Sequence, residues 1–175
     1  MLRLLRNTAI ILMLTFSSQG HAMGLFDVFT IYVFSEVRGV VTLDGKPAEG
    51  AEIIRIGDHE EDKVYTDRAV TDAAGRFEFG PISTFSLRPI MLGTIIRQKI
   101  EIKYQGNSYL AWDTVKRNNH RYGELNDEGV DSPIKLNLTC ELMDSQEGRT
   151  VIQMEIRKVG IYGLCTWEGQ PEGKE

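Results

Sequence analysis

The stretches that decide the fold are EVRGVVTLDGKPAEGAEI at residues 36–53 and TDAAGRFEF at residues 71–79. In the first, Asp44-Gly45 accepts the positive φ angles of a tight turn, so strands are expected on both sides of it. In the second, the segment Asp72-Ala73-Ala74-Gly75 has Asp at the first and Gly at the fourth position of a type I turn. Alternation in Phe77-Glu78-Phe79 then predicts a strand with one buried face.

These residues resemble the carboxypeptidase regulatory-like domain, a member of the transthyretin-like (prealbumin-like) sandwiches. The family pattern is V-x-G-x-V, a turn, G-x-P-x-x-G-A-x-V and then T-D-x-x-G-x-F-x-F, and both halves occur here in order. Gly39 suits a strand position that another group approaches closely, and Ala51 is small where two sheets would meet. The motif therefore implies a β-sandwich and says little about activity. The C-terminal half is also similar to exported bacterial proteins with this sandwich, which implies a stand-alone periplasmic domain.

The rest of the chain also alternates apolar and polar residues with period two. The clearest run is 134–142. Residues 95–104 and 108–116 are expected to form a hairpin, joined by Gln105-Gly106-Asn107-Ser108. We therefore predict an all-β, antiparallel sandwich of about seven to nine strands, with a long polar loop at residues 117–131.

Residues 1–22 have the pattern of a secretory signal peptide, with Arg3 and Arg6 before the apolar run 9–16 and Ala22 as a plausible cleavage residue. That run is short for a membrane span, although a retained N-terminal anchor is the alternative. The expected organisation is a signal peptide at 1–22, one domain at 23–168 and a flexible tail at 169–175. We expect a periplasmic or secreted protein without stable membrane insertion after cleavage.

Charge and cysteine usage fit an exported domain. The chain has 175 residues and a net charge of −5, which becomes −7 when residues 1–22 and their two arginines are removed. Acidity argues against nucleic acid as a partner. Cys140 and Cys165 are the two cysteines, and in an exported protein we expect them to form one disulfide, with two buried thiols as the alternative.

Motifs for catalysis or metal binding do not occur in the sequence. His59 and His120 are the histidines of residues 23–175, and neither stands in a zinc-binding spacing. A Gly-x-Ser-x-Gly nucleophile motif and a glycine-rich phosphate loop do not occur either. We therefore expect no catalytic residues, metal site or cofactor, with a divergent hydrolase as the least favoured alternative.

Recognition of another protein is the expected function, in one form as an immunity or inhibitor protein. The candidate binding residues have the aromatic and basic character of a contact surface: Tyr109, Trp112, Arg117, His120, Arg121 and Tyr122. Trp112 could instead belong to the core. A module that binds a small molecule or glycan through the aromatic hairpin is the alternative function. The apolar strand at 25–36 is a candidate contact between identical chains.

Overall fold

The computed structural model describes residues 30–59, 63–85, 94–125, 135–143, 151–153 and 158–169. These residues form β-strands and connections, which confirms the all-β prediction. The strands are β1 (Thr30–Phe34), β2 (Val37–Leu43), β3 (Lys46–Pro47), β4 (Glu52–His59), β5 (Val64–Val70), β6 (Arg76–Phe79), β7 (Ile82–Phe85), β8 (Ile96–Tyr104), β9 (Asn107–Lys116), β10 (Leu136–Glu141), β11 (Val151–Gln153), β12 (Lys158–Tyr162) and β13 (Cys165–Trp167).

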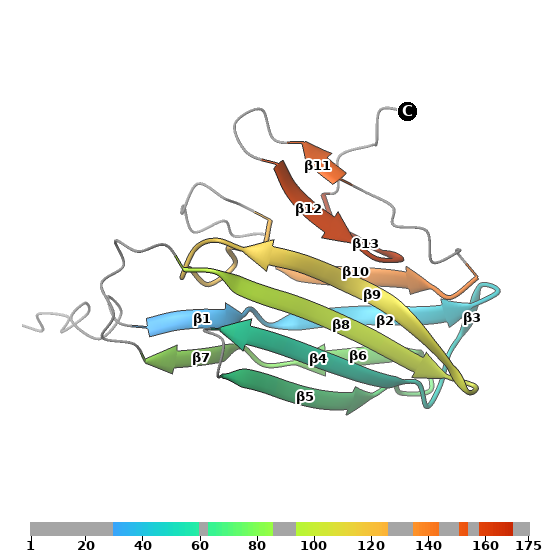
Figure 1. The fold of residues 1–175 in the computed structure, drawn as a ribbon. Helices are drawn as coiled ribbons and strands as arrows, with labels where there is room; N and C mark the ends of the chain where they lie inside the picture. Colours follow the sequence, from blue (N-terminus) through green and yellow to red (C-terminus); the bar gives the residue numbers. More distant parts are fainter. Residues whose placement is uncertain are drawn as a thin grey trace, which may run out of the picture.

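Two layers of strands face each other across the core (Figure 1). One sheet has the order β11-β12-β9-β8-β4-β5 and is antiparallel throughout. The other has the order β13-β10-β2, where β2 also pairs with β3 and β6. The antiparallel pair β1–β7 extends this second sheet, since β1 runs into β2 and β6 runs into β7. The expected sandwich is therefore confirmed.

The family-like motif forms the turns that its residues predict. Asp44 and Gly45 both have positive φ, 54° and 69°, as a tight turn requires. The amide of Gly75 donates to the carbonyl of Asp72 over 2.8 Å. A Cβ on Gly39 would lie 2.5 Å from the ring of Phe77, so glycine lets the ring cross β2.

The predicted hairpin is confirmed as β8–β9. Its ladder runs from the pair Ile96–Lys116 to the pair Tyr104–Asn107, with one irregularity at Ile100–Glu101. Gln105 and Gly106 form the turn, with φ angles of 49° and 81°. Ala111 has no partner at this irregularity, so Ala111 and Trp112 are both buried, and β9 then alternates regularly from Trp112 to Lys116, where the next loop begins.

Two features differ from the expectation of a simple antiparallel sandwich with seven to nine strands. Ser35-Glu36 interrupts the strand pattern between β1 and β2, and Gly80-Pro81 interrupts it between β6 and β7, so four shorter strands are present. β10 runs parallel to β2, from the pair Leu136–Val37 to Glu141–Thr42. The chain crosses from β9 to the other sheet before β10 begins, so β10 enters the sheet in the direction of β2.

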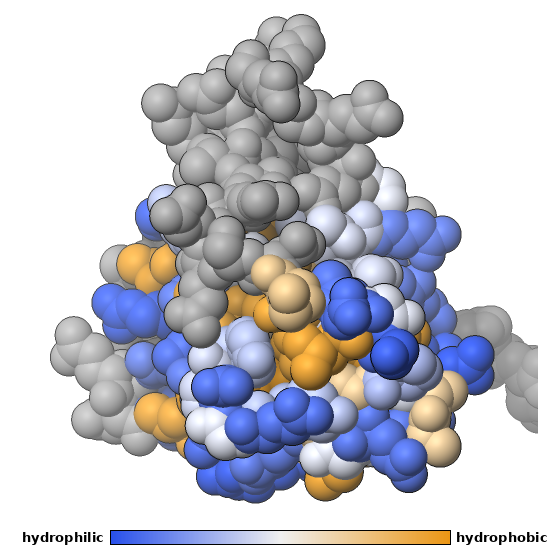
Figure 2. Space-filling model, turned by 90° about the vertical axis from the view of Figure 1, so that its right-hand side faces the viewer, coloured by the Kyte–Doolittle hydropathy of each residue, from blue (hydrophilic) through white to orange (hydrophobic). Residues whose placement is uncertain are grey.

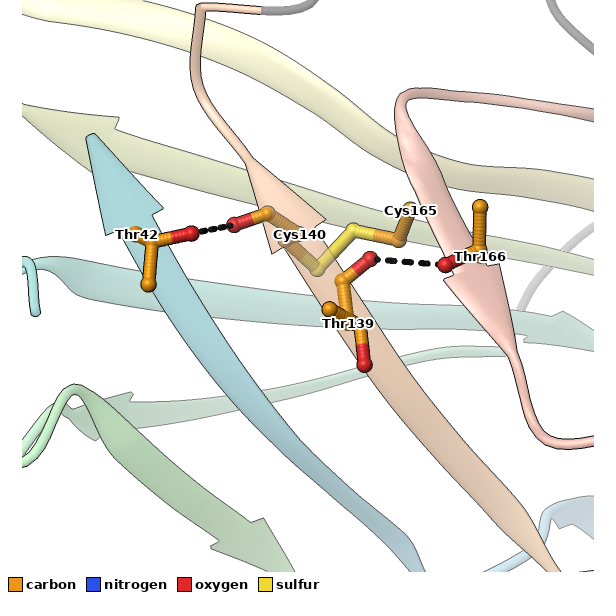
Figure 3. Close-up of a disulfide and its surroundings, with 5 residues drawn as sticks. All are labelled: Thr42, Thr139, Cys140, Cys165 and Thr166. Atoms are coloured by element: carbon orange, nitrogen blue, oxygen red, sulfur yellow. Dashed lines mark hydrogen bonds between the residues drawn. A yellow bond between two sulfur atoms is a disulfide. The ribbon is translucent and has the colours of Figure 1, made fainter. Parts of the chain in front are cut away.

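The predicted disulfide joins Cys140 and Cys165, which stand directly opposite each other on β10 and β13 with a Cα–Cα distance of 4.2 Å (Figure 3). Both cysteines are buried. Next to them Trp112 and Trp167 pack edge to face, with ring centroids 5.6 Å apart. The disulfide thus holds β13 against the part of the core that contains both tryptophans.

Hydrophobic side chains also gather at one end of the sandwich, where Figure 2 shows an orange area between hydrophilic side chains. Leu43 and Tyr104, at the ends of β2 and β8, pack against the core, and Met143 after β10 is 66% exposed. No helix long and apolar enough to cross a membrane occurs among the described residues.

Several predicted features fall partly or wholly outside the described residues. This group contains the signal peptide, residues 25–29 of the predicted contact strand, residues 126–131 of the loop and residues 170–175 of the tail. Within the described part of the contact strand, Ile31, Val33 and Phe34 are buried inside the chain. Contact between identical chains through residues 25–36 stays a prediction.

Candidate functional site

Polar residues occupy inward positions at one end of the sandwich. The alternation that buries Ile96, Ile100 and Trp112 also turns Gln98 on β8 and Lys116 on β9 inward, and both are at most 2% exposed. Buried polar groups are costly unless they have partners, so their contacts indicate what this end of the fold requires.

Glu124 supplies the central partner. One of its carboxylate oxygens accepts hydrogen bonds from the amide of Ser35 (2.9 Å) and from Nε2 of Gln98 (3.0 Å). Its other oxygen accepts from the hydroxyl of Ser35 over 2.6 Å. Lys116 Nζ lies 3.6 Å from the carboxylate. We call these four residues, Ser35, Gln98, Lys116 and Glu124, the Glu124 cluster; all are buried.

Lys116 joins three segments of the chain at this cluster. Its ammonium group donates to the carbonyls of Tyr32 (2.9 Å) and His120 (2.5 Å), which connects β1 and the loop after β9. Burial lowers the pKa of Lys116, and the attraction of Glu124 opposes that shift. The pair therefore keeps two opposite charges in a place where either charge alone would be strongly unfavourable.

The cluster fixes the loop at residues 117–125 to the junction of β1 and β2. The hydroxyl of Ser35 accepts a hydrogen bond from the amide of Tyr122 (2.8 Å), which holds Tyr122 at a φ of 62°. Asn118 donates to the carbonyl of Gly123 (2.9 Å). A positive φ is uncommon for tyrosine, and such conformations persist where surrounding contacts determine them.

A surface forms directly outside the cluster. Arg121 bonds Glu36 through two guanidinium nitrogens, at 3.1 and 2.6 Å, and the hydroxyl of Tyr122 donates to the same carboxylate over 2.6 Å. The guanidinium carbon lies 5.9 Å from the ring centroid of Tyr32 and 5.2 Å from that of Tyr122. We call these residues, Tyr32, Glu36, Arg121 and Tyr122, the Arg121 surface.

The charges of this surface stabilise one another. Burial acts to raise the pKa of Glu36, but hydrogen bonds from Tyr122 and Arg121 outweigh it, and the net shift is downward. The hydrogen bond to Glu36 raises the pKa of Tyr122. The Arg121 side chain is 40% exposed and Lys135 lies 3.7 Å from Glu36, so the carboxylate is held by cations that still face solvent.

Arg55 on β4, in the same sheet as Gln98 and Lys116, supports the same junction. It is 1% exposed, its guanidinium group lies over the rings of Phe34 and Phe79, and it donates to the carbonyl of Ser35 over 2.9 Å. An ion pair with Asp67 on β5 balances its charge. Burial lowers the pKa of Arg55, and Asp67 opposes that shift.

The structure brings together only part of the predicted binding set. Arg117, His120, Arg121 and Tyr122 lie in the loop, and Arg117 is exposed while the other three are half-buried. Tyr109 lies at the other end of β9, about 25 Å away along the strand. Trp112 is fully buried in the core, as the alternative interpretation of this residue predicted.

Sequence reasoning missed the residues that organise the loop. Gln98 and Lys116 carried a usable signal, since each is polar at a position where its strand's alternation predicts burial. Ser35, Glu36 and Glu124 had no such signal. They lie in connections between strands, where no alternation of apolar and polar residues indicates which side chains face inward.

Two observations on the described residues concern metal binding and nucleophiles. Within them no three His, Cys, Asp or Glu side chains gather where they could hold a metal ion. Ser35 is the serine beside a carboxylate and an amine, but it is 0% exposed and its hydroxyl already donates to Glu124 and accepts from Tyr122. A substrate could not reach that hydroxyl without opening the core.

A second surface feature is a groove on the outer face of the β13-β10-β2-β6 sheet. Its volume is about 770 Å³. Thr139, Thr166 and Val40 contribute to its lining, and the ion pair between Arg38 and Glu78 lies beside them. Polar and apolar atoms line the groove in about equal measure, and the groove is open to solvent.

Comparison with known proteins gives a family for most of the chain. No curated protein and no solved structure shows significant similarity to it. A family model described as "Domain of unknown function (DUF6795)" matches residues 37–145, which run from the start of β2 past the end of β10. Because that match covers more than half of the sequence, the chain belongs to the DUF6795 family.

Proposed function

We propose that this protein is a non-catalytic interaction protein of the periplasm or the secreted fraction, and that it binds another protein through the Arg121 surface. We also propose that its sandwich is of the transthyretin-like kind, on the basis of the motif at residues 36–53 and 71–79. One form of this function is an immunity or inhibitor protein that covers a partner's active site.

One observation carries the proposal: a buried charged cluster is hydrogen-bonded to a surface loop and to the junction beside it. Glu124 and Lys116 lie in the core, yet their hydrogen bonds go to the loop and to the β1–β2 junction. A buried ion pair is weak support for stability, because apolar residues could fill the space as well. Fixing a loop before binding lowers the entropy lost when a partner docks.

The chemistry of the exposed residues fits the same role. Arginine and tyrosine are the residue types most often found at the energetic centres of protein interfaces. Here Arg121 lies near the rings of Tyr32 and Tyr122, and its side chain is 40% exposed. The burial of Ser35 supports a role without catalysis.

The test compares two arginines that each pair with a glutamate on the surface. Mature protein carrying Arg121→Ala or Arg38→Ala is used to capture partners from periplasmic extract, with mass spectrometry as the readout. Arg38 pairs with Glu78 on the grooved face, so it is the matched control. We expect a protein that the wild type and Arg38→Ala capture and Arg121→Ala does not. Equal capture by all three would contradict the proposal.

The groove supports a second candidate function, binding of a small molecule or glycan. The aromatic hairpin first suggested for this role cannot supply Trp112, which is buried, whereas the groove offers hydroxyl, amide and charged groups. Replacing Thr139 with Trp would fill the groove floor. Glycan-array binding that is lost in Thr139→Trp but kept in Arg121→Ala would favour this second function.

A further inference from the structure

β5 differs from the other strands at the sheet edges. It has seven residues, paired with β4 in one regular register and without a bulge. The other edge strands among the described residues, β1, β3, β6, β7, β11 and β13, have two to five residues each. Short edge strands protect proteins from unwanted pairing, so a long regular edge needs an explanation. In Figure 1, β5 forms the lower border of the front sheet.

The hydrogen bonds that flank β5 show which of its backbone groups face outward. The amide of Thr71 donates to the carbonyl of Ala51, and the amide of His59 donates to the carbonyl of Lys63. Both pairs continue the β4–β5 register. The residues that exchange backbone hydrogen bonds across this register are therefore the odd-numbered residues of each strand. The N–H and C=O groups of the even-numbered residues 64, 66, 68 and 70 therefore point away from β4.

These outward groups form a continuous row. In the part of the chain that the structure describes, they have no backbone partner, because β5 pairs with β4 alone. The side chains of the same four residues are exposed, and Val64 and Val70 are 62% and 66% exposed. Two exposed valines therefore stand at the two ends of an unpaired strand edge.

The pattern of this edge is complementary to itself. When a second copy of β5 is placed antiparallel with the two-fold axis at Asp67, Val64 lies opposite Val70 of the second copy, and Thr66 lies opposite Arg68. All four outward-facing residues of each strand then enter hydrogen-bonded pairs. We infer that two copies of this chain associate through β5 in this register and form one continuous sheet of twelve strands, six from each copy.

The charges at the axis are compatible with that pairing. Two Asp67 side chains face each other there, but each keeps the guanidinium group of its own Arg55 within hydrogen-bond distance. Two ion pairs therefore meet at the axis in place of two unpaired carboxylates. The valine pairs at both ends remove apolar surface from water, which is the favourable term of the association.

Cysteine cross-linking tests both the pairing and its register. In the proposed register, residue 64 of one copy and residue 70 of the other are directly opposite, at a Cα separation that suits a disulfide. Equivalent residues 64 are about 20 Å apart, and so are residues 70. We expect a mixture of Val64→Cys and Val70→Cys chains to form a covalent dimer under oxidising conditions, and each variant alone to stay uncross-linked.

A second pair of variants separates pairing from folding. Thr66→Pro removes an outward N–H and leaves the bonds to β4 in place, so we expect a monomer in sedimentation velocity with the fold retained by circular dichroism. Met143→Lys, which changes an exposed apolar residue away from β5, should still dimerise. A wild-type protein that sediments as a monomer at all concentrations would overturn the inference. Cross-links within one variant alone that are as strong as those in the mixture would also overturn it. If β5 pairs with a different protein and not with a second copy, the purified chain would sediment as a monomer.

Discussion

At the scale of single residues, polar and charged groups lie where a sandwich normally has apolar side chains. The alternation of β8 and β9 was enough to predict that positions 98 and 116 face inward, although it could not say what their polar groups would meet. Glu124 could not be predicted, because its contact with Ser35 joins connections 89 residues apart in the sequence. Long-range partners of loop residues depend on the assembled fold.

Removal of the central carboxylate should destabilise the protein strongly. Glu124→Ala leaves Lys116 charged and buried, and we expect the free energy of unfolding to fall by about 3–5 kcal/mol. Glu78→Ala breaks an ion pair whose side chains are each 61% exposed, so it should cost no more than about 1 kcal/mol. Urea denaturation of the three proteins measures both losses. Equal losses would show that Glu124 does not hold a buried charge.

A second prediction at this scale concerns acid. Glu141 accepts hydrogen bonds from the amides of Asp44 and Gly45 and from the hydroxyl of Thr42, at 2.8–3.0 Å. Burial acts to raise the pKa of Glu141, but these bonds outweigh it and lower the pKa below its ordinary value of 4.5. The bonds therefore stabilise the fold above about pH 4.5, and this contribution is lost as the pH falls through the lowered pKa.

The measurement for Glu141 is the free energy of unfolding between neutral pH and pH 3 for the wild type and Glu141→Gln. We expect the variant to be less stable at neutral pH and the difference to shrink in acid, because protonation removes the same carboxylate. A difference that stays constant over this range would contradict the role given to the charge.

At the scale of elements, turn residues and alternation were sufficient to predict the β2–β3 turn, the β8–β9 hairpin and the strand of Phe77 and Phe79. These features are local, since each depends on a few neighbouring residues. The parallel pairing of β10 with β2 was not predicted, because a strand's partner depends on the path of the chain between the sheets. The interruption between β1 and β2 at Ser35-Glu36 was not predicted either, because it also depends on how the chain packs in the assembled fold.

The close contact between β2 and β6 gives a prediction at this scale. Gly39→Ala places a Cβ 2.5 Å from the ring of Phe77, so we expect a loss of about 1–3 kcal/mol in the free energy of unfolding. Gly80→Ala meets no atom within 4 Å among the described residues and should be nearly neutral. Thermal unfolding followed by circular dichroism distinguishes them. Similar stability of the two variants would mean that Phe77 does not pack over β2.

At the scale of the whole molecule, the sequence predicted the class of the fold and the disulfide, whereas the position of the candidate site followed only from the assembled sheets. Tyr32 and Tyr122 are distant in sequence, and the packing of the loop on β1 brings both near Arg121. The family match ends at residue 145, so Cys165 and the strand β13 that carries it lie beyond the matched region. The disulfide attaches that strand to the family domain.

The disulfide should therefore contribute to global stability. Replacing both cysteines with alanine removes a cross-link between residues 25 apart, and we expect a loss of about 3 kcal/mol. Comparison of guanidinium unfolding for this variant and for the oxidised wild type gives the difference. If the two curves coincide, β13 does not need the cross-link to stay in the sheet.

The central claim is that the Glu124 cluster holds the 117–125 loop in one conformation before any partner binds. Amide hydrogen exchange of the free protein tests it directly, because the amides of Ser35 and Tyr122 donate to Glu124 and Ser35 respectively. We predict that both amides exchange as slowly as those of β8 and β9, and that Glu124→Ala accelerates both. Fast exchange of Tyr122 in the wild type, comparable with that of an exposed loop, would contradict the account.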